Sequence, residues 1–135
     1  MRINLHFGSP TIAHDSADFS RVVRSIGESI VLVNRLHLHA FPDTPPLYES
    51  GVRYIDESDR PEQGIDIPLI IQAGGSDCLN LSAWRIAELR QQGERAKFRI
   101  FWKKYPNNFR LFHVLVRRGN MKLEDPSKLL GMGKI

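Results

Sequence analysis

The chain changes its hydrophobic period at Gly93, and this change constrains the fold more than any other feature of the sequence. Before Gly93, apolar residues recur at steps of three and four, which is typical of helices. After Gly93, apolar and polar residues alternate, which is typical of strands buried on one side. Helices followed by strands, without regular alternation of the two, predict an α+β fold with a small antiparallel sheet.

Two helices are expected in the first half. The first has a cap at Asp15 or Ser16 and ends near His39, because three prolines follow within seven residues. A second, short helix is expected after a cap at Asp66, with Pro68 in its first turn. Between the two, residues 47–54 are expected to form a short helix or turn and residues 56–64 an exposed polar loop.

A third helix is expected to begin at Cys78, behind a cap at Ser76 or Asp77, and to stop at Gly93. Its first two turns are apolar on more than one face, so we expect them to be buried. Residues 97–102, 110–117 and 121–124 are expected as strands, with a hairpin signal at positions 119–120 and a turn at 105–108. The predicted core is therefore a Cys-bearing helix packed on an antiparallel sheet of about three strands.

We expect one domain over residues 1–135, with an N-terminal segment and helix (1–40), a loop-rich approach (41–77) and a core helix and sheet (78–135). A chain of this length can bury a core without metal or disulfide support.

A single cysteine cannot form an internal disulfide, no stretch is long and apolar enough for a membrane span, and the first residues lack the apolar core of a signal peptide. Synthesis in the cytoplasm is the expectation.

Charge is divided unevenly along the chain. Residues 1–77 hold 6 Lys/Arg and 11 Asp/Glu, a balance of −5, whereas residues 78–135 hold 13 Lys/Arg and 4 Asp/Glu, a balance of +9. A basic half suits nucleic acid or an acidic protein surface, and an acidic half suits a basic neighbour in an assembly. The alternative is that both are solvated surfaces, and nucleic acid is the less favoured partner.

The chemistry-bearing residues are Cys78, His113 and Asp125. A thiol at a helix N-terminus is favoured as thiolate by the helix dipole and the unpaired amides there. A cysteine acyl-transfer site also requires an imidazole to move the proton and a third group to orient the ring. The 35 residues from Cys78 to His113 can return the chain to the thiol, and the 12 residues from His113 to Asp125 can place them on neighbouring strands.

Two further residues are candidates for supporting roles. Gln72 is the side-chain candidate for an oxyanion donor beside the amide of Cys78, and Asp77 is a helix cap or a support for the site. Each residue also has a structural interpretation: Cys78 as a small buried residue, His113 as a hydrogen-bonded strand histidine, Asp125 as a cap before a proline, Gln72 as a surface residue. No zinc motif or phosphate loop is present, and we expect neither metal nor cofactor.

Several stretches resemble the transglutaminase-like superfamily, which has a papain-like thiol fold, and more narrowly small proteins of that type from tailed bacteriophages. They are residues 42–54 (PDTPPLYESGVRY), 75–90 (GSDCLNLSAWRIAELR), 112–118 (FHVLVRR), 123–127 (LEDPS) and 130–132 (LGM). The resemblance covers roughly residues 36–132. One departure is the pair Leu79-Asn80, where such proteins often carry two acidic residues, and no tryptophan precedes the cysteine.

The resemblance implies that Cys78 is the nucleophile, His113 the base and Asp125 the orienting acid. It further implies a phage protein made in the host cytoplasm and associated with the virion, with other virion proteins as partners, for example in a symmetric ring. If active, such a protein is a cysteine-dependent acyltransferase or hydrolase. The alternative is a non-catalytic structural component of the tail, neck or capsid that uses the fold for docking.

Overall fold

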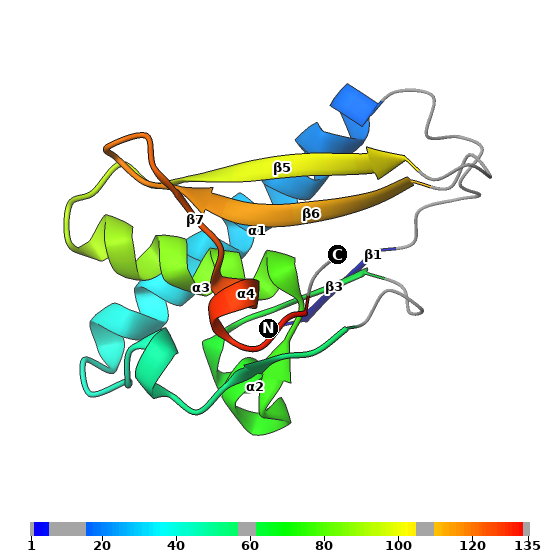
Figure 1. Cartoon of the computed structure of the whole chain (residues 1–135). Coiled ribbons are helices and arrows are strands. Elements are labelled where there is room, and N and C mark those ends of the chain that lie inside the picture. The colour runs from blue at the N-terminus through cyan, green and yellow to red at the C-terminus, as the bar shows by residue number, and fades with distance from the viewer. Residues whose placement is uncertain (1, 6–15, 57–61, 105–109, 134–135) are drawn as a thin grey trace.

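A computed structural model describes residues 2–5, 16–56, 62–104 and 110–133, and its fold is α+β as predicted (Figure 1). The elements in chain order are β1 (Arg2–Leu5), α1 (Ser16–Ala40), the 3-10 helix η2 (Leu47–Glu49), β2 (Arg53–Tyr54), β3 (Glu62–Ile65), α2 (Ile67–Ala73), β4 (Gly75–Ser76), α3 (Cys78–Gln91), β5 (Lys97–Lys104), β6 (Arg110–Arg117), β7 (Leu123–Glu124) and α4 (Pro126–Leu129). The helices α1 and α3 and the strands β5 and β6 begin and end close to the predicted positions.

The largest sheet has the antiparallel order β5-β6-β7, which confirms the three predicted strands. In β5 and β6 the apolar residues lie opposite one another, as with Ile100 and Val114. Their side chains pack against α1 and α3 in the main core cluster. In Figure 1, α1 passes behind β5 and β6, and the opposite side of the sheet faces the viewer.

The central element is α3, because it contributes to two core clusters at once. Leu79, Ala83 and Ile86 pack in the cluster with α1 and the main sheet. Leu81 and Trp84 pack in a second cluster with residues from η2, α2 and the end of α4. Burial on nearly every side explains why the apolar residues of this helix do not follow a single stripe.

Two small sheets were not predicted. β1 pairs with β3 in antiparallel orientation, and β2 pairs with β4 in parallel orientation. The prediction of an exposed loop over residues 56–64 was therefore wrong at its end, where β3 begins at Glu62 and Gly64 is buried. A Cβ at Gly64 would come within 2.6 Å of Ile30 on α1, so this polar segment forms a strand that passes tightly against the helix.

The third strand and the segment after it also differ from prediction. β7 covers only Leu123–Glu124, because Met121 adopts a left-handed backbone conformation (φ 70°) and belongs to the preceding turn. Asp125 then caps a short helix, α4, which was not predicted. The expected turn at residues 105–108 lies outside the described residues.

Asn80 is a buried hydrogen-bonding centre that joins α3 to β3 and β4. Its Oδ1 accepts from the amide of Ile65 at 3.0 Å, and its Nδ2 donates to the carbonyl of Gln63 at 2.7 Å and to Ser76 Oγ at 3.0 Å. Asn80 is fully buried. Asn80 therefore has a structural role, on the interior side of the helix.

We expect Asn80→Ala to lower the free energy of unfolding by about 3 kcal/mol, because it leaves buried backbone groups of β3 without partners. Urea unfolding of this variant measures the effect. The matched control is Gln92→Ala, which removes an exposed amide just after α3. Equal stability of the two variants would show that these hydrogen bonds do not hold β3 on α3.

Candidate active site

Cys78 is the first residue of α3, as predicted. The preceding residue, Asp77, is the N-cap, and its Oδ1 accepts from the amide of Asn80 at 3.1 Å. The Cys78 side chain is partly buried against the main core cluster and is not part of a disulfide. The thiol therefore lies at the positive end of a 14-residue helix.

His113 and Asp125 are in direct contact: His113 Nε2 lies 2.8 Å from Asp125 Oδ2. Burial by itself would raise the pKa of Asp125, but the hydrogen bond and charge of His113 and the amide of Lys128 hold that pKa below its ordinary value. The carboxylate is therefore ionised at neutral pH and can only accept, so Nε2 of the imidazole carries the hydrogen. This leaves Nδ1 of neutral His113 as the ring atom able to take up a proton.

Asp125 also serves as a helix cap, because its Oδ1 accepts from the amide of Lys128 at 3.3 Å. One carboxylate oxygen therefore caps α4 and the other contacts His113. The cap fixes the direction in which the second oxygen points, toward His113.

A hydrogen bond joins α3 to β6, close in the chain to Cys78 and to His113. Ser82 Oγ donates to the carbonyl of Val114 at 3.2 Å. Ser82 lies one helical turn after Cys78 on the same side of α3, and Val114 follows His113 in β6. The helix that starts at the thiol thus runs against the strand that carries the imidazole.

Tyr54 lies near both Cys78 and Asp125, and no pattern in the sequence predicts a role for it. In the β2–β4 pair it is opposite Ser76, two residues before Cys78, and its amide donates to the carbonyl of Leu130, just after α4, at 2.9 Å. The pKa of Tyr54 is raised to about 12, mainly by burial. Smaller contributions come from the negative charges of Cys78, Asp56, Asp77 and Asp125. The phenol is therefore a neutral hydrogen-bond donor near the thiol and near Asp125.

The two supporting candidates are placed differently. Asp77 is buried and caps α3, in agreement with its interpretation as a helix cap. Gln72 is exposed on α2, and no hydrogen bond found among the described residues links it to Cys78. Its role as an oxyanion donor stays a prediction. The other predicted donor is the amide of Cys78 itself, at the first turn of the helix.

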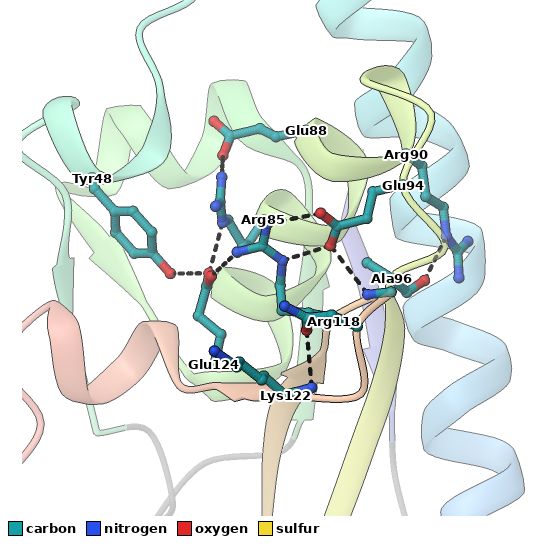
Figure 2. Close-up of polar contacts among 11 residues, drawn as sticks. Tyr48, Arg85, Glu88, Arg90, Glu94, Ala96, Arg118, Lys122 and Glu124 are labelled. Atoms are coloured by element: carbon teal, nitrogen blue, oxygen red, sulfur yellow. Dashed lines mark hydrogen bonds and ion pairs between the residues drawn. The ribbon is translucent and has the colours of Figure 1, made fainter.

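An ion cluster holds β7 immediately before Asp125. Figure 2 shows the carboxylate of Glu124 beside Tyr48, Arg85 and Arg118. It accepts from Arg85 Nε at 2.6 Å and from Arg118 Nη1 at 2.8 Å, and the hydroxyl of Tyr48 donates to it as well. Arg85 belongs to α3, so this cluster fixes the start of the Asp125 turn relative to the helix that carries Cys78.

The cluster extends in two directions from Glu124. Arg85 also reaches Glu88, whose second carboxylate oxygen accepts from the amide of Leu47 at 2.8 Å. Arg118 forms a bidentate ion pair with Glu94, which lies in the loop between α3 and β5. In the sequence, Glu88 is the residue that indicates such a cluster. It is a carboxylate within a helix expected to be buried, and a buried carboxylate requires a partner.

No protein-family model, no curated protein and no solved structure matches this chain. Within the residues that the structure describes, no three His, Cys, Asp or Glu side chains are grouped so that they could hold a metal ion. None of the described helices is long and apolar enough to cross a membrane.

The Glu94–Arg118 pair predicts a pH dependence of stability. The hydrogen bond from Arg118 lowers the pKa of Glu94 to about 2. A carboxyl group with a lowered pKa stabilises the fold above its unfolded pKa, and this stabilisation is lost as pH falls through the folded value. We therefore expect Glu94→Gln to be less stable than the wild type at pH 7 and to lose less stability between pH 4.5 and pH 2.

Urea midpoints at pH 7, 4.5 and 2 measure this difference. The control Glu49→Gln removes the same charge at an exposed position outside the cluster. An identical pH dependence in the wild type and Glu94→Gln would contradict the assignment of this pair.

Proposed function

We propose that this protein is a transglutaminase-like acyltransferase or hydrolase with Cys78 as nucleophile, His113 as general base and acid, and Asp125 as the residue that orients the imidazole. The observation that carries the proposal is the 2.8 Å His113–Asp125 contact, on the strand that Ser82 joins to the Cys78 helix. The carboxylate of Asp125 binds Nε2 of the imidazole, so Nδ1 stays available for proton transfer. A thiol site requires one ring nitrogen that can exchange a proton in this way.

The reaction is acyl transfer from a carboxamide. The thiolate of Cys78 attacks the carbonyl carbon, and the amide of Cys78 donates to the oxygen that becomes negative. His113 delivers the proton taken from the thiol to the departing nitrogen, so that ammonia or an amine leaves and a thioester remains. An amine or water then attacks the thioester, gives its proton to His113 and releases Cys78, which completes the cycle.

We further propose that the protein acts in, or is built into, the virion of a tailed phage. The support is the resemblance of residues 36–132 to small phage proteins of this type. The competing function is a structural module of the tail, neck or capsid, and the uneven charge, −5 over residues 1–77 and +9 over residues 78–135, favours docking between copies or neighbours.

Substitution of the three residues tests the chemistry. With a glutamine-containing peptide as donor and a labelled primary amine as acceptor, we expect Cys78→Ala to abolish both amine incorporation and ammonia release. Asp125→Asn should lower kcat about 10³-fold, since the amide no longer holds the productive tautomer. The control His39→Gln removes an exposed imidazole from α1 and should retain full activity.

Two outcomes decide between the proposals. A thioester at Cys78, seen by mass spectrometry of the wild type incubated with donor peptide, supports catalysis. An inert wild-type protein that is nevertheless present in purified particles at fixed stoichiometry would contradict catalysis and support the structural module.

A further inference from the structure

The face of the main sheet opposite the side that packs on α1, called here the outer face, also carries His113. Residues paired across antiparallel strands share a face, and the pairing gives four rows on this face, the last at positions 103 and 111. The first row is Lys97, Arg117 and Leu123; the second is Arg99 and Leu115; the third is Phe101 and His113. The proposed base thus shares a face with a basic row two residue pairs away.

The cations of the outer face are gathered without acidic partners. Lys97 and Arg117 are directly opposite each other, and Arg99 lies on the neighbouring row of the same face. None of the three forms an ion pair with a carboxylate among the described residues, although Lys97 is near enough to help lower the pKa of Glu28 on α1. Like charges directly opposite each other on a sheet destabilise it, so this arrangement costs stability in the isolated protein.

Exposed apolar groups accompany these cations. Leu123 is 52% exposed and Phe101 39% exposed, on either side of the basic rows. Asp125 follows β7 directly, but its carboxylate is engaged by His113 and by the amide of Lys128. The outer face therefore offers cations and apolar side chains together, next to the proposed reacting groups.

We propose that the outer face binds an acidic polypeptide segment and presents the acyl-donor or acyl-acceptor side chain of that segment to the site at Cys78 and His113. This inference deepens the proposed function and rests on it for the substrate role, although the binding itself does not require turnover. Charge complementarity identifies the partner: at least three cations with no bound carboxylate attract an acidic chain, and steer its approach.

Nucleic acid is the other polyanion, and the outer face suits it less well. Single-stranded nucleic acids bind through bases that stack on exposed aromatic rings. Phe101 is the exposed aromatic ring in these rows, and the guanidinium of Arg99 lies over it, 4.6 Å from the ring centre. A ring face that is already occupied by a cation is not open for a base.

Fluorescence anisotropy tests the inference with three labelled probes. The first is a 12-residue peptide rich in Asp and Glu with one central Gln, the second is the same peptide with Asn and Gln in place of the acidic residues, and the third is a 12-nucleotide single-stranded DNA. The protein used is the full chain with Cys78→Ala, so that no probe is consumed. We expect the acidic peptide to bind most tightly, with an affinity that falls as salt increases.

Variants then locate the binding surface. Arg99→Gln combined with Arg117→Gln should weaken acidic-peptide binding about tenfold. The matched control is Arg21→Gln combined with Arg24→Gln, which removes two exposed charges from α1 and should leave binding unchanged. Equal losses in the two double variants, equal affinity for the amide peptide, or tighter binding of the DNA would overturn the inference.

Failure of the inference and failure of the proposed function give different results. If the wild type shows no acyl transfer but the acidic peptide still binds through Arg99 and Arg117, the proposed chemistry is wrong and the binding surface stands. If acyl transfer occurs and the double variant binds the acidic peptide as well as the control does, the chemistry stands and the binding surface is wrong.

Discussion

The burial of α3 on nearly every side is the constraint on which the rest of the structure depends. Its apolar residues fill both core clusters, so the helix cannot shift without opening one of them. Because Cys78 is the first residue of this helix, the position of the thiol is determined by the core itself. A reactive group mounted on a rigid, buried element is held more accurately than one on a loop.

Polar contacts then tie the other parts of the site to the same helix. Ser82 bonds the strand that bears His113, Arg85 bonds the glutamate before Asp125, and Asn80 bonds β3 and β4. Each contact comes from a different turn or side of α3. Three segments that are distant in the chain therefore take their positions from one element.

The helix α1 and the strands β5 and β6 could be predicted because each has a long, regular pattern, and α3 because a capping residue and a glycine mark its ends. The strand β3 could not, since its residues are polar and its pairing with β1 depends on Gly64 lying against α1, a contact between distant parts of the chain. Order along the chain suggested that Asp125 could reach His113, but only the structure shows that one carboxylate caps α4 and holds the imidazole at once. Tyr54 was missed because its place beside Cys78 depends on a two-residue parallel pair that no local pattern signals.

The central claim is that Cys78 is an activated thiol. The most direct measurement is the rate of alkylation of the intact protein by iodoacetamide as a function of pH, read by mass spectrometry at Cys78, the sole cysteine. An activated thiol gives a rate that has reached its plateau by about pH 7, and His113→Gln should shift the rise to higher pH. A wild-type rate that still climbs through pH 8 to 9, about where ordinary thiols ionise, would contradict the account.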